Sequence, residues 1–123
     1  MTAAPDAGLA WKTFAAPVSV QSCRVEMAWE SPMGRGTPGP LVSGVAITFV
    51  NHASVAAKRV VFSIRYNGRS ATIRDDGTFS PGVPIRAQFD AFARRDYWRP
   101  EPSYCRVSEV DFTDGTVWRP AAG

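Results

Sequence analysis

The chain of 123 residues is 45% hydrophobic and 20% charged, and its 14 basic and 11 acidic side chains give it a net charge of +3. This composition excludes a disordered chain, and the length suits one domain with a core of its own. The charges are interspersed, and no apolar stretch approaches the roughly 20 residues of a membrane helix. We therefore expect neither a nucleic-acid partner nor a membrane span.

The first 17 residues are rich in Ala and Pro and show no hydrophobic period. They predict a loose N-terminal arm, and they lack the basic start and the apolar run of a signal peptide. We expect one domain over residues 18–119, followed by a short tail at residues 120–123.

From Val18 onward, apolar and polar residues alternate, which is typical of half-buried strands. In VSVQSCRVEMAW the apolar parity changes between Val20 and Cys23, which predicts a β-bulge near Gln21 or Ser22. Two further runs, LVSGVAITFVN and KRVVFSIRYNG, each place apolar side chains on one face: Val45, Ile47 and Phe49, then Val60, Phe62, Ile64 and Tyr66. The second run ends in Asn-Gly, a strong hairpin signal.

Four more strands are expected in the second half of the chain. SATIRDD predicts a short strand that ends at a turn-rich corner, DDGTFSPG. The next strand carries Val83, Ile85, Ala87 and Phe89 on one face, and YCRVSEVDF and GTVWR flank a turn at residues 113–115. Seven strands without a helix favour an all-β antiparallel β-sandwich, with a small closed barrel as the alternative.

Four stretches of the chain resemble a known group of domains. ITFVN, VVFSIRYNG, DDGTFSPGV and CRVSEVDFTDGTVW together resemble the immunoglobulin-like modules of small exported bacterial proteins, and more loosely the bacterial FxLYD-type sandwich. The resemblance covers roughly residues 18–119. It implies an immunoglobulin-like β-sandwich in a secreted or periplasmic protein.

The two cysteines, Cys23 and Cys105, lie in strand-like runs 82 positions apart (105 minus 23). With a single histidine in the chain, they cannot complete a zinc site. Two interpretations stay open: separate buried thiols, or a disulfide between an early and a late strand. A disulfide over so long a loop is worth about 4 kcal/mol in the chain-entropy model, and it is typical of the periplasm or the cell exterior.

No set of residues predicts catalysis, a cofactor or a metal site. The single histidine, His52, lies in a turn without an evident partner, and nucleotide-binding and hydrolase motifs are missing from the sequence. If the strands alternate in direction, Asp75, Asp76 and Asp114 come close together at one end, but calcium takes about six to eight oxygen ligands. The Asp-Gly-Thr copies at residues 76–78 and 114–116 therefore predict turns.

The same alternation brings the loops at residues 31–40, 67–69 and 94–103 to the opposite end. Long loops on a rigid sandwich often carry binding functions, and arginine and aromatic residues often anchor interfaces. The candidate binding residues are Arg35, Arg69, Arg94, Arg95, Tyr97, Trp98 and Arg99. Alternatively, Tyr97 and Trp98 fold back over the end of the sandwich.

These patterns predict a non-catalytic, exported binding module that recognises a protein or cell-surface partner through its Arg/aromatic loop end. The alternative is a structural or assembly module that acts through sheet-edge pairing or self-association. A short terminal strand at residues 115–119 favours this alternative, because it leaves an edge open to another chain.

Overall fold

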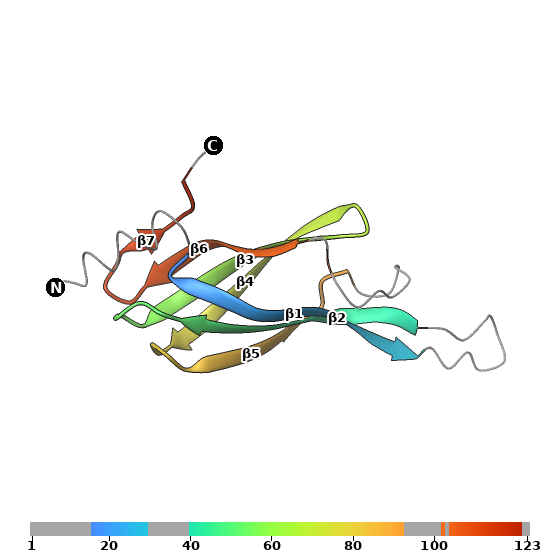
Figure 1. Ribbon diagram of the computed structural model, residues 1–123, viewed down its shortest axis with the longest axis horizontal. Coiled ribbons are helices and arrows are strands. Elements are labelled where there is room, and N and C mark those ends of the chain that lie inside the picture. The colour runs from blue at the N-terminus through green and yellow to red at the C-terminus, as the bar shows by residue number, and fades with distance from the viewer. Residues whose placement is uncertain (1–15, 30–39, 93–101, 103, 122–123) are drawn as a thin grey trace.

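The computed structural model describes residues 16–29, 40–92, 102 and 104–121. These residues form β1 (Val18–Trp29), β2 (Pro40–Asn51), β3 (Ala57–Tyr66), β4 (Arg69–Phe79), β5 (Pro84–Phe89), β6 (Tyr104–Phe112) and β7 (Val117–Trp118). Two antiparallel sheets, ordered β1-β2-β5 and β4-β3-β6-β7, lie face to face (Figure 1). The predicted all-β sandwich of about seven strands is confirmed. No helix that could span a membrane occurs among the described residues.

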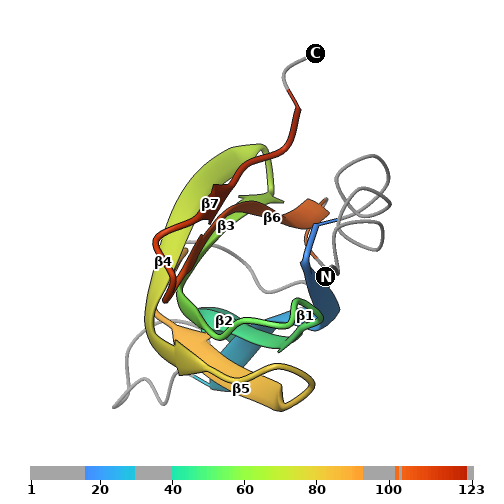
Figure 2. The same cartoon turned by 90° about the vertical axis from the view of Figure 1, so that its left-hand side faces the viewer.

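The order of the strands is immunoglobulin-like. Lettered A to G along the chain, the strands form an A-B-E sheet and a D-C-F-G sheet, whereas the antibody constant-type domain keeps its fourth strand with A-B-E. The turn between β3 and β4 accounts for this difference, because Asn67 and Gly68 have φ values of 51° and 75°. Two positive φ values make a tight type I′ hairpin, which keeps β4 beside β3 (Figure 2).

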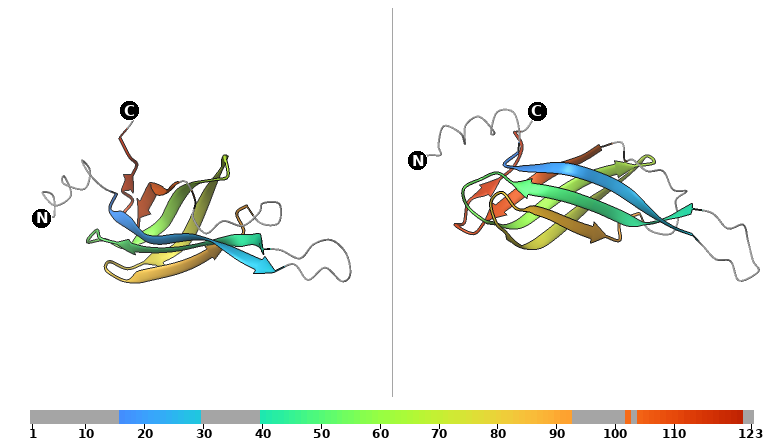
Figure 3. Two further views of the ribbon diagram at one scale, coloured as in Figure 1. Left: turned by 45° about the vertical axis from the view of Figure 1, so that its right-hand side comes forward. Right: turned by 60° about the horizontal axis from the view of Figure 1, so that its bottom comes forward.

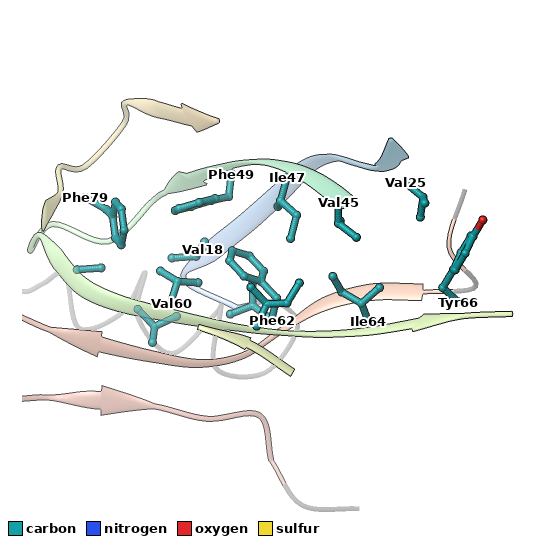
Figure 4. Close-up of a cluster of buried hydrophobic side chains, with 14 of the residues drawn as sticks. Val18, Val25, Val45, Ile47, Phe49, Val60, Phe62, Ile64, Tyr66 and Phe79 are labelled. Carbon is teal, nitrogen blue, oxygen red and sulfur yellow. The ribbon is translucent and has the colours of Figure 1, made fainter. Parts of the chain in front are cut away.

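The core lies between the sheets and is built from alternate residues of the strands (Figure 4). Phe49 of β2 contacts Phe62 of β3 and Phe79 of β4, with 5.2 Å between ring centroids in both pairs. The inward faces predicted for β2 and β3 are confirmed, and the same holds for Ile85, Ala87 and Phe89 of β5. Val83 departs from the prediction, because it precedes β5 and is 46% exposed.

Cys23 and Cys105 form a disulfide that joins β1 to β6, and therefore one sheet to the other. Their Cα atoms are 6.5 Å apart. Of the two interpretations left open by the sequence, the disulfide is correct. The register of β1 against β2 shifts between Val20 and Ser22, which confirms the bulge predicted there.

One end of the sandwich, which we call the turn end, is held together by hydrogen bonds. Asn51 is 1% exposed, and its Nδ2 donates to the Phe79 carbonyl at 3.0 Å while its Oδ1 accepts from the Ala53 N–H. The Thr113 N–H donates to the Ala56 carbonyl at 2.9 Å. The connections at residues 52–56, 80–83 and 113–116 therefore meet at this end, as the alternation of strand directions predicts.

The second Asp-Gly-Thr copy forms the expected turn between β6 and β7. Gly115 has a φ of 93°, which suits glycine. The Asp114 carboxylate accepts hydrogen bonds from the Thr116 N–H at 2.9 Å and from the Thr116 hydroxyl at 2.6 Å. This short loop of bonds is ordinary aspartate turn chemistry.

The first Asp-Gly-Thr copy is not a turn, and the expected corner at this place is wrong. β4 runs through it to Phe79, whose ring packs edge-on against Phe49. Arg59 of β3 donates from Nε to Asp76 at 2.6 Å, and a bulge opposite Lys58 takes up one extra residue of β4. Pairing with β3 thus overrides the local turn preference of the sequence.

Candidate binding surface

Most of the predicted binding residues lie outside the described residues: Arg35, Arg94, Arg95, Tyr97, Trp98 and Arg99. Arg69 is described, and it begins β4 directly after the hairpin. Its guanidinium carbon lies 5.9 Å from the ring centroid of Phe92. We call this end of the sandwich the hairpin end.

Phe92, which the sequence analysis did not single out, closes the core at the hairpin end. Its ring packs on Tyr66 with 5.5 Å between centroids, and it is 8% exposed. It holds a φ of 61°, an uncommon conformation for a bulky residue. The connection between β5 and β6 therefore includes Phe92, whose ring is packed on Tyr66 at the hairpin end. It ends at Tyr104, the first residue of β6.

Outward side chains of β4, β3 and β6 form four rows across the four-stranded sheet. From the hairpin end, the rows are Ser70-Arg65-Tyr104, Thr72-Ser63-Arg106, Arg74-Val61-Glu109 and Asp76-Arg59-Asp111. We call the first two rows the basic half-face and the last two the neutralised half-face. The two halves differ in how their arginines are partnered.

Arginines of the neutralised half-face have carboxylate partners. Arg59 and Arg74 place their Nε atoms 2.6 and 3.6 Å from the carboxylate of Asp76. Arg119 follows β7, and its Nε lies 2.8 Å from Glu109. Positive and negative charges are therefore matched across this half of the sheet.

The carboxyl groups of this half have shifted pKa values that fit the same arrangement. The hydrogen bond from Arg59 lowers the pKa of Asp76. Hydrogen bonding with Asp111 lowers the pKa of Glu109, whereas burial raises the pKa of Asp111. The Asp111 Oδ1 atom is buried and has no hydrogen-bond partner among the described residues.

The basic half-face presents arginines that have no carboxylate partner in the described part of the chain. Arg65 donates from Nη1 to the Ser70 hydroxyl at 3.3 Å, and the guanidinium carbon of Arg106 lies 4.2 Å from the ring centroid of Tyr104. Both arginines are exposed. Their neighbours in the two rows include the hydroxyls of Ser63, Ser70 and Thr72. Guanidinium groups and hydroxyls together suit carboxylate, phosphate or sulfate oxygens.

Neither His52 nor the aspartates form a metal cluster in the region that the structure describes. The exposed His52 does have a partner, since its Nε2 shares a hydrogen bond of 2.6 Å with the Ser19 hydroxyl. No group of three His, Cys, Asp or Glu residues there could hold a metal ion. Asp75, Asp76 and Asp114 thus do not gather into an ion-binding cluster, because Asp76 pairs with Arg59 and Asp114 caps its own turn.

Sequence reasoning missed the combination of Arg65, Tyr104 and Arg106. Alternation places Arg65 and Arg106 on outward faces, but it does not say which strands are neighbours. The pairing of β3 with β6 makes these two arginines diagonal neighbours, at about 7–8 Å.

Comparisons of the chain with models of protein families, with curated proteins and with solved structures find no match. The class of the molecule is the one that its fold defines, an immunoglobulin-like β-sandwich closed by a disulfide.

Proposed function

We propose that the protein is a non-catalytic, exported binding module that recognises an acidic protein or cell-surface partner through the hairpin end and the basic half-face. One observation carries the proposal, the unequal charge balance of a single sheet face. Arg59, Arg74 and Arg119 are matched by carboxylates, whereas Arg65 and Arg106 have no described carboxylate partner. Unmatched arginines attract and steer an anionic partner.

The chemistry of the half-face supports binding to oxygen anions. The planar guanidinium group donates two parallel hydrogen bonds to a carboxylate or phosphate. Tyr104 lies under Arg106, a cation–π contact worth about 0.5–1 kcal/mol at an exposed site. Export is supported by the Cys23–Cys105 disulfide, because disulfides persist in oxidising compartments.

The predicted loop residues extend this proposal. Residues 93–103 connect Phe92 to β6, and both ends of this connection lie at the hairpin end. We assign Arg94, Arg95, Tyr97, Trp98 and Arg99 to the same site, with the aromatic residues as anchors and the arginines as steering charges.

Charge-matched variants test the proposal. Arg65→Gln/Arg106→Gln and Arg74→Gln/Arg119→Gln each remove two positive charges from one sheet face. On immobilised poly-L-glutamate, we expect the first variant to elute at clearly lower salt than the wild type, and the second to change less. Equal elution of the two variants would mean that retention follows net charge alone, and the proposal would fail. Circular dichroism checks that both are folded.

A second candidate function, an assembly module, is favoured by the length of β7. This strand has two residues and pairs with β6 only at Val110 and Asp111. Within the described chain, residues 104–109 of β6 therefore have a strand neighbour on one side only. Open edges pair with other chains. Sedimentation equilibrium distinguishes the candidates, because an assembly module forms dimers or larger species as concentration rises, and a strict monomer removes this candidate.

A further inference from the structure

We propose that an extended segment of the partner, with alternating acidic and apolar residues, adds to the open edge of β6 as another strand. This inference rests on the proposed function, which brings an acidic partner to the same surface. It adds the way in which the partner binds and the sequence pattern that it carries.

The open edge comes from the unequal pairing of β6. On one side, β3 pairs with β6 along its length, from Tyr104 opposite Arg65 to Phe112 opposite Ala57. On the other side, β7 reaches only Val110 and Asp111, and Figure 3 shows how short β7 is beside β6. No other strand of the described chain pairs with residues 104–109 on this side, and the backbone groups of such an edge accept an added strand.

The regular part of this edge is short. Ser108 is an extra residue of β6 in its register against β3, because Val61 faces Glu109 and Phe62 faces Val107. Its hydroxyl donates to the Val61 carbonyl at 3.2 Å. Such a bulge interrupts the alternation, so we place the added strand along residues 104–107.

The two faces of β6 define the side chains that an added strand would need. Its residues would alternate between the outer and inner faces of the sheet. On the outer face they would meet Tyr104 and Arg106, which favours acidic residues. On the inner side they would meet Cys105 and Val107, which pack with the core and favour apolar residues.

A second copy of the chain fits this edge less well than an acidic segment does. A copy that paired through the same stretch would bring its own Arg106 to the shared edge. Like charges on adjacent strands are destabilising, and Arg106 has no described carboxylate that would offset them.

Two peptides of equal composition, both with capped termini, test the inference. In one peptide Glu and Val alternate, and in the other all Glu residues precede all Val residues. We expect fluorescence anisotropy to show that the alternating peptide binds about tenfold more tightly, a difference of about 1.4 kcal/mol. It should also slow amide hydrogen exchange at residues 104–107. Arg106→Gln should weaken this binding by about tenfold, as expected for a charged hydrogen bond. The control Arg74→Gln should leave it unchanged.

Equal affinity for the two peptides, or binding without added amide protection, would overturn strand addition. The proposed function would still stand if retention on poly-L-glutamate depends on Arg65 and Arg106. It would fail together with the inference if the two double variants elute at the same salt concentration. Protection of residues 104–107 that rises with protein concentration in the absence of peptide would assign the edge to a second copy and overturn the inference.

Discussion

Asp75, which precedes the first Asp-Gly-Thr copy, and Asp114, which begins the second, respond to folding in opposite ways. Burial, reinforced by the charge of Asp76, raises the pKa of Asp75, which pairs in register with the buried Val60. Hydrogen bonds from Thr116 lower the pKa of Asp114. A carboxyl group whose pKa is raised by folding destabilises the native state while it is ionised, and one whose pKa is lowered stabilises it.

Asp75→Asn should make the protein more stable at pH 7. Because the folded pKa of Asp75 lies above its ordinary value of 3.8, the wild type loses stability as pH rises between the two values. The amide does not ionise, so the advantage of the variant should shrink as pH falls through the folded pKa of Asp75 and disappear below the ordinary value. Urea unfolding of both proteins across the acidic range measures this difference.

Asp114→Asn is the matched control with the opposite sign. In the wild type, folding lowers the pKa of Asp114. The stability that this carboxylate contributes is therefore present above the unfolded pKa and is lost as pH falls through the folded pKa. We expect this variant to be less stable than the wild type at pH 7 and to approach it in acid. Shifts of the same direction in both variants would contradict the account of the two sites.

Among the strands, β5 depends on a single glycine of its neighbour. Among the strands that the structure describes, β5 pairs with β2 alone, and Gly44 of β2 has a φ of 152°. A Cβ atom at this position would overlap the carbonyl oxygen of Phe89, the last residue of β5. Glycine within a strand here permits a close approach of two backbones.

Gly44→Ala should lower the free energy of unfolding by more than Gly68→Ala does, and by up to about 3 kcal/mol, because the backbone of β5 must move away. Gly68→Ala is the control: its φ is 75°, but nothing lies within 4 Å of the added Cβ. It should cost about 1–2 kcal/mol, for the left-handed backbone alone. Urea unfolding compares the two, and an equal or smaller loss in Gly44→Ala would show that the contact with Phe89 does not matter.

Local patterns predicted the strands well, and failed where distant contacts decide. The inward faces of β2 and β3 follow from alternation, and the hairpin follows from Asn67-Gly68. The extent of β4 does not, because its continuation depends on Arg59 binding Asp76 across the sheet. The basic half-face escapes sequence reasoning for the same reason, since its two arginines become neighbours only through the pairing of β3 with β6.

At the scale of the whole molecule, the disulfide is the strongest single constraint on the unfolded chain. Cys23→Ala/Cys105→Ala opens a loop of 82 positions, so we expect a loss of about 4 kcal/mol of stability. Urea unfolding measures the loss, with the wild type under reductant as the matched control. A loss below about 1 kcal/mol would contradict the chain-entropy account.

The disulfide also sets how the molecule responds to mechanical tension. Strands β2 to β5 all lie between Cys23 and Cys105, so a force on the chain outside this loop passes through the covalent bond. Such a force can peel away β7, the first part of β1 and the last part of β6, but it cannot draw out the residues between the cysteines. Arg65 and Tyr104 lie within the loop closed by the disulfide, and Arg106 follows it directly. Under a pulling force, the residues of the basic half-face would therefore be the last to lose their strand pairing.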